Sequence, residues 1–112
     1  MTFSRWDIVA VDFPFVEGMD AKRRPGLVIS SARLHQPHKL YWIAMISTAQ
    51  AGERPDDVMV SDIAAAGLPV ACAVRPARIA TISESRIQRK LGSLTARDRN
   101  AVSAMLKRFI PT

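Results

Sequence analysis

The 112-residue sequence predicts one small α+β domain, made mainly of antiparallel strands and closed by a C-terminal helix. Two observations predict this class. Short apolar stretches rich in β-branched and aromatic residues follow one another closely, as in small all-β structures. The sequence also lacks helical segments between these stretches, and parallel strands would require such crossover helices. We therefore expect a strongly twisted antiparallel sheet or partly open barrel with short helices on one side, as a single domain over residues 1–112.

The first half of the chain predicts three strands joined by polar connections. Alternating apolar residues indicate the strands, and proline and glycine mark their ends. Lys22, Arg23 and Arg24 stand before Pro25, and proline keeps the preceding residue out of the helical region, so Arg24 lies at the mouth of a strand. The predicted strands span residues 7–15, 25–31 and 41–48; the predicted connections are a polar loop over 16–24, a turn or loose hairpin over 32–40, and a loop over 49–55.

The second half predicts further short strands and three helical segments. Strands are expected over 56–60 and 70–75, with 78–82 continuing the latter or starting the next. Ser61 or Asp62 caps a single helical turn that Gly67 stops. A short helix is expected over 83–90. The clearest helix covers 95–110, where Thr95 and Asp98 resemble a capping box and an apolar stripe follows at helical spacing.

Positive charge is concentrated in the second half of the chain. Up to residue 74 there are seven Lys/Arg and eight Asp/Glu, a balance of −1. From Arg75 onward there are nine and two, a balance of +7, which gives the net +6 of the whole chain. This distribution favours a polyanionic partner such as nucleic acid, although an acidic protein is attracted equally well.

Several classes of protein are disfavoured by composition. A single cysteine, Cys72, excludes an internal disulfide framework, and its apolar surroundings predict a buried, inert thiol. No apolar run approaches the roughly 18 residues of a membrane span, and the first residues lack the apolar core of a secretory signal. We therefore expect a cytoplasmic protein.

Metal ligands are not arranged in a recognisable pattern. His35 and His38 flank a proline without an obvious third ligand. Asp56 and Asp57 are adjacent, and adjacent strand residues point to opposite faces of a sheet. We expect neither a metal nor a cofactor.

Polar side chains at predicted strand ends are the remaining candidates for chemistry. They are Arg24, Ser47, Thr48, Arg75 and Arg78. Arginine matches phosphate geometry with a bidentate fork and stabilises developing negative charge, and a serine or threonine hydroxyl donates to a phosphate oxygen. The set therefore suits a phosphodiester, although these residues alone do not place a group for proton transfer.

Five sequence blocks, in this order and spacing, resemble the PemK/MazF-like growth-inhibitor toxins of type II toxin–antitoxin systems. The blocks are residues 7–15 (DIVAVDFPF), 22–30 (KRRPGLVIS), 43–48 (IAMIST), 74–82 (VRPARIATI) and 89–94 (RKLGSL). The resemblance implies an SH3-like barrel and a homodimer that cleaves single-stranded RNA selectively and without a metal. It also implies neutralisation by an acidic antitoxin.

The resemblance also implies roles for particular residues. Arg24, directly before the proline, takes the place of the catalytic arginine, and Ser47, or Thr48 one step later, that of the catalytic hydroxyl. An acidic residue that some members carry shortly after the Arg75 strand is replaced here by Pro76 and Ala77, so the general base is not identified. The residues expected to bind RNA are Lys22, Arg23, Arg75, Arg78, Asp12 and Gln50.

Two other functions remain open at this level. One is a non-catalytic SH3-like module that binds nucleic acid or protein, and the other is a toxin directed at gyrase.

Overall fold

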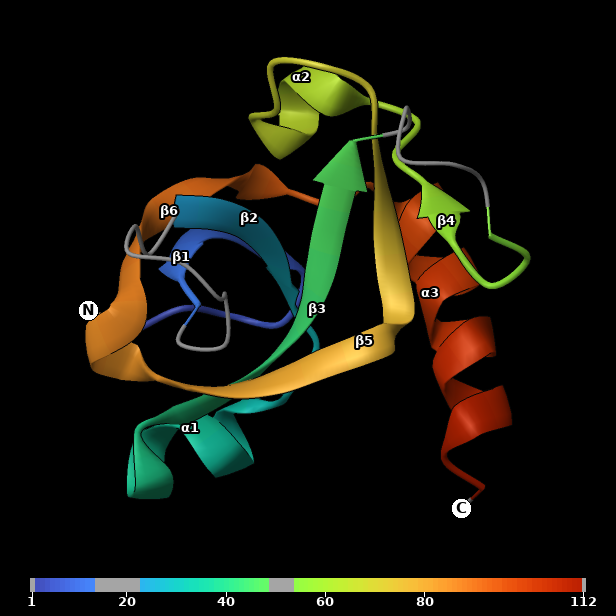
Figure 1. Cartoon of the computed structure of the whole chain (residues 1–112). Coiled ribbons are helices and arrows are strands. Elements are labelled where there is room, and N and C mark those ends of the chain that lie inside the picture. The colour runs from blue at the N-terminus through green and yellow to red at the C-terminus, as the bar shows by residue number, and fades with distance from the viewer. Residues whose placement is uncertain (1, 14–22, 49–53, 112) are drawn as a thin grey trace.

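The computed structural model describes residues 2–13, 23–48 and 54–111 (Figure 1). Its strands are β1 (Asp7–Asp12), β2 (Arg23–Val28), β3 (Leu40–Thr48), β4 (Val58–Met59), β5 (Cys72–Ser83) and β6 (Ile87–Ser93). Its helices are α1 (Ala32–His38), α2 (Ile63–Ala66), the 3₁₀ turn η2 (Glu84–Arg86) and α3 (Ala96–Phe109). The expected fold class, mainly β with short helices and a C-terminal helix, is confirmed.

The six strands form one sheet in the order β4-β5-β3-β2-β1-β6, and all their pairings are antiparallel. Figure 1 shows the sheet curling round, with β5 bent sharply and α3 alongside β5 and β4. β4 and β6 stand at opposite ends of the strand order, so the sheet is a partly open barrel. None of the described helices is long and apolar enough to cross a membrane.

Apolar residues pack on both faces of the sheet because side chains alternate along each strand. The helix-side core includes Ile8, Leu27, Ala44, Ile46, Val74, Leu94, Val102 and Leu106. The inner core includes Val9, Val11, Phe13, Val28, Tyr41, Ile43, Ile82 and Ile87. Even-numbered residues of β3 therefore face α3, and odd-numbered ones face the interior of the curled sheet.

The prediction of a turn or loose hairpin over 32–40 is wrong, because this segment contains helix α1. Pro37 stands in the last turn, so its missing N–H costs only one bond at the helix end. Lys39 ends the helix in the left-handed conformation and donates its N–H to the carbonyl of His35. The buried His35 ring stacks on Tyr41 at a centroid distance of 4.1 Å. This tertiary contact outweighs the local signal of the proline.

The prediction of a helix over 83–90 is also wrong, because only the η2 turn is helical and β6 follows at Ile87. β6 pairs with β1, and Ile87 is buried in the inner core. Gly92 does not stop a helix. It lies in β6 where α2 passes, and an added Cβ would lie 2.4 Å from the carbonyl oxygen of Ala65.

The predicted capped turn is confirmed in α2, where the Asp62 carboxylate accepts from the N–H of Ala65 and Gly67 ends the helix at φ 72°. The capping box of α3 is not formed. The Asp98 carboxylate instead accepts from the backbone N–H of Ser61 at 2.8 Å and from its hydroxyl at 2.9 Å. These bonds join α3 to the segment after β4.

Candidate functional site

Arg24 and Ser47 lie where β2 and β3 diverge. The last recorded pair of this antiparallel ladder is Gly26 with Met45. Arg24 and Ser47 are each two residues beyond that pair, so they lie on the same face of the sheet as Gly26 and Met45. Arg24 is exposed, Ser47 is half-buried, and β2 is held from its other side by the pairing of Arg24 with Val11. The two residues therefore occupy one end of the inner-core face.

The register of β3 distinguishes the two candidate hydroxyls. Ser47 stands opposite Ala73 of β5, and Thr48 stands opposite Cys72. Since neighbouring strand residues point to opposite faces, Ser47 shares the face of Arg24 and Thr48 lies on the other face. Cys72 belongs to the helix-side core, and its burial raises the pKa of its thiol, which matches the expectation of a buried cysteine.

Arg75 joins the same face from β5. It stands opposite Met45, one row behind Ser47. Its Nε lies 3.7 Å from Oδ2 of Asp57, and the two side chains are only 13% and 10% exposed. The β4–β5 ladder pairs Val58 with Val74, and one further step along it leads to Asp57 and Arg75. The register of the sheet edge thus brings the carboxylate to the guanidinium.

Burial of Arg75 leaves its Nε without a hydrogen-bond partner among the described residues. The ion-pair distance of 3.7 Å is longer than a hydrogen bond. An unpaired buried N–H is costly, so each such case in a folded protein requires an explanation.

A pocket of about 380 Å³ opens beside this ion pair. It lies between the segment before β4 and a bulge in β5. At this bulge the consecutive β3 residues Ala44 and Met45 pair with Ile79 and Arg75, which are four positions apart in β5. The lining residues are Arg54, Pro55, Asp56, Asp57, Arg75, Ala77 and Arg78. Three guanidinium groups and two carboxylates therefore converge on one small space. We call it the bulge pocket.

The remaining predicted RNA-binding residues lie elsewhere. Asp12 pairs with Arg23, whose Nε is 3.6 Å from Oδ1 of Asp12, and Gln88 donates to Oδ2 of Asp12 at 2.5 Å. By alternation these residues are on the other face of β1 and β2 from Arg24. Lys22 and Gln50 lie outside the described residues.

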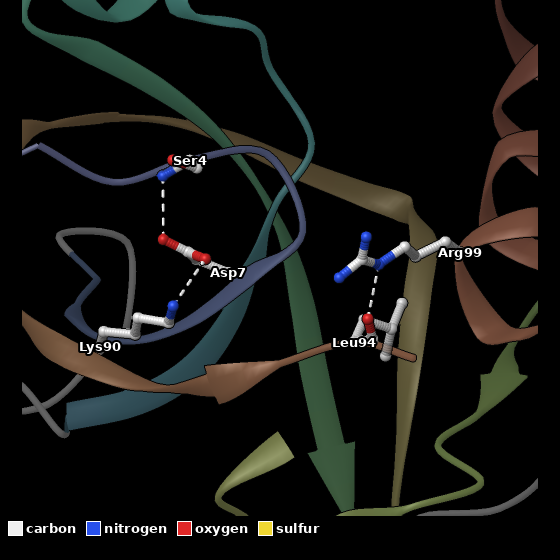
Figure 2. Close-up of polar contacts among 5 residues, drawn as sticks. All are labelled: Ser4, Asp7, Lys90, Leu94 and Arg99. Atoms are coloured by element: carbon white, nitrogen blue, oxygen red, sulfur yellow. Dashed lines mark hydrogen bonds and ion pairs between the residues drawn. The ribbon is translucent and has the colours of Figure 1, made fainter. Parts of the chain in front are cut away.

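Two cations of the basic second half, Lys90 and Arg99, serve the fold itself, as Figure 2 shows. Nζ of Lys90 lies 3.3 Å from Oδ1 of Asp7, and the N–H of Ser4 donates to Oδ2 of the same carboxylate at 2.9 Å. Nε of Arg99 donates to the carbonyl of Leu94 at 2.6 Å. The net charge of this half is therefore a poor guide to which cations meet a ligand.

The two histidines do not contribute to this site. His35 is buried, and its Nε2 lies 2.6 Å from the hydroxyl of Ser30, which accepts from the N–H of Trp42. Burial lowers the pKa of His35, so the neutral ring is favoured. His38 is exposed, and the described residues contain no group of three potential metal ligands.

Asp57 is the site residue that sequence reasoning missed. The sequence suggests Asp57 only as a metal ligand, because its spacing from Arg75 gives no sign that the two side chains pair. The available signal was the apolar run after Asp56-Asp57, which predicts an edge strand beside the Arg75 strand. The order of the strands in the sheet, which the sequence did not reveal, makes those two strands neighbours.

This arrangement is chemically suited to a phosphodiester. Arg24 and Arg75 offer fork-shaped cationic donors, and Ser47 on the same face offers a hydroxyl.

Comparison with protein families gives a match over residues 4–110 to the PemK-like, MazF-like toxins of type II toxin–antitoxin systems. The chain belongs to this family. A comparison with curated protein sequences gives no match.

Solved structures of this family share the fold of the chain. MazF from Deinococcus radiodurans is 20% identical, with a TM-score of 0.80 over 100% of this chain and 99% of that one. An endoribonuclease in complex with its cognate antitoxin, from a mycobacterial species, is 17% identical, with a TM-score of 0.75 over 96% and 93%. The Mycobacterium tuberculosis toxin MazF-mt6 is 21% identical, with a TM-score of 0.72 over 91% and 93%.

Proposed function

We propose that this MazF-like chain is a metal-independent endoribonuclease that cleaves single-stranded RNA with sequence selectivity. The observation that supports the proposal is the placement of Arg24, Ser47 and Arg75 on one face at the end of the β2–β3 ladder. Membership of a toxin family supports the further proposal that this cleavage inhibits translation and growth.

In the proposed reaction the RNA supplies its own nucleophile. The 2′-oxygen attacks the adjacent phosphorus, the bond from phosphorus to the 5′-oxygen breaks, and a 2′,3′-cyclic phosphate and a 5′-hydroxyl result. The 2′-hydroxyl loses a proton, and the leaving 5′-oxygen gains one. Arg24 and Arg75 neutralise the charge of the pentacoordinate state, and Ser47 donates to a non-bridging oxygen.

An acidic antitoxin and a second copy of the chain are the protein partners that we propose. One related endoribonuclease was solved with its cognate antitoxin. The net charge of +6 favours an acidic chain that folds onto the site. Such a partner would compete with RNA for Arg24 and for the exposed cations around it.

Cleavage in the presence of EDTA tests the proposed function. Purified protein is incubated with a long single-stranded RNA and excess EDTA, and the new ends are mapped. We expect discrete cuts that carry 2′,3′-cyclic phosphates. Intact RNA at micromolar protein would instead favour the non-catalytic binding module.

A further inference from the structure

The bulge pocket adjoins the proposed reactive groups and shares Arg75 with them. Arg75 contributes to both, since it lines the pocket and shares the face of Ser47. A volume of about 380 Å³ lies within the usual range for small-molecule sites, which begins at roughly 300 Å³. The pocket is therefore of a size to hold one nucleotide beside the phosphate that is cut.

Asp57 holds Arg75 in place at this pocket. A buried ion pair contributes little net stability, because desolvation of both charges offsets their attraction. The pair does fix the orientation of the Arg75 guanidinium. That group has five N–H donors, so some of them stay available beyond those that one carboxylate can accept. A phosphate in the pocket would meet a cation that is already oriented, with the exposed Arg78, which also lines the pocket, as a second donor.

Asp56 is the carboxylate of the pocket that has no recorded ion pair or hydrogen bond within the described part of the chain. An ionised carboxylate only accepts hydrogen bonds, through two oxygens. Guanine is the RNA base whose Watson–Crick edge presents two adjacent N–H donors, N1–H and the 2-amino group. Adenine and cytosine place an acceptor beside their amino group, and uracil has acceptors on both sides of its single donor.

We propose that the bulge pocket is a guanine-nucleotide subsite of the RNA-cleaving centre. Asp56 accepts from N1–H and the 2-amino group of the base, Arg75 and Arg78 bind its phosphate, and Asp57 positions Arg75. The inference rests on the proposed ribonuclease function for its biological meaning, and it requires that the guanine lie next to the cut bond. Its chemistry is testable without cleavage.

Binding of single nucleotides tests the pocket directly. The ¹⁵N-labelled protein is titrated separately with GMP, AMP, CMP and UMP and followed by NMR. We expect GMP to shift signals of residues 54–57 and 75–78 and to bind about tenfold tighter than UMP. Asp56→Asn keeps the size of the side chain and should abolish this preference, whereas Glu84→Gln, with the same charge change outside the pocket, should keep it.

Mapping of cut sites then connects the pocket to cleavage. The wild type should favour guanine at one fixed position beside the cut bond, and Asp56→Asn should lose that preference by about tenfold while cleavage continues. Arg78→Ala should weaken GMP and UMP alike, because phosphate contacts carry no base information.

The outcomes separate the two proposals. Preferential GMP binding in the pocket without RNA cleavage would support the guanine subsite and reject the proposed ribonuclease function. Cleavage with equal GMP and UMP binding, or with GMP shifts confined to residues outside the pocket, would reject the guanine subsite and leave the ribonuclease in place.

Discussion

The buried pair of Asp57 and Arg75 allows a quantitative prediction. At 3.7 Å and an effective dielectric constant of about 20, Coulomb's law gives an attraction of about 4 kcal/mol. Desolvation opposes most of this gain in the intact protein, but removing one partner leaves the other charge buried and uncompensated. We therefore expect Asp57→Asn and Arg75→Gln each to lower the free energy of unfolding by about 3 kcal/mol.

A double-mutant cycle isolates the pair from its surroundings. If the cost of each single variant is the stranded charge, the double variant, which leaves neither charge behind, should lose less than about 1 kcal/mol rather than the about 6 kcal/mol of two independent losses. Urea unfolding followed by tryptophan fluorescence measures all four proteins, with Arg24→Ala introduced throughout to limit toxicity. The partly exposed pair of Asp12 and Arg23 serves as the control, with a coupling below about 1 kcal/mol.

Additive losses would refute this reasoning. They would mean that Asp57 and Arg75 contribute to stability independently, so that Asp57 does not hold the guanidinium. A coupling as small as that of the control pair would have the same meaning.

Three further predictions concern catalysis and pH. Arg24→Ala should abolish growth inhibition and RNA cleavage with an unchanged circular dichroism spectrum, and undiminished toxicity would remove Arg24 from the mechanism. Ser47→Ala should lower the cleavage rate by about 10²-fold, as loss of a transition-state donor does, while Thr48→Ala has little effect; the reverse result would assign the hydroxyl to Thr48. Because burial lowers the pKa of His35 below 6.5, the folded state binds fewer protons than the unfolded state just below that pH. Stability should therefore be complete well above pH 6.5 and fall as the pH is lowered below that value. His35→Gln should flatten this slope in urea titrations and His38→Gln should not.

Local patterns in the sequence predicted most of the fold because each depends on neighbouring residues. Alternation and β-branching indicated β1, β2 and β3 within a few residues, and Asp62 with Gly67 bounded α2. The failures fell where packing opposed a local signal. Pro37 argued against α1, but the buried His35 holds that helix against Tyr41. Polar residues argued for a helix after Ser83, but pairing with β1 makes the segment a strand.

The candidate site, too, was predicted from the sequence only in part. The sequence by itself determined that Arg24 stands in extended backbone before a buried strand, because proline restricts the residue before it. It also placed a hydroxyl at the end of β3, without deciding between Ser47 and Thr48. Only the tertiary structure decided the face, since strand register carries Ser47 to the side of Arg24 and Thr48 to the other. Only the strand order set Asp57 beside Arg75, because contacts across a sheet edge leave no trace in sequence spacing.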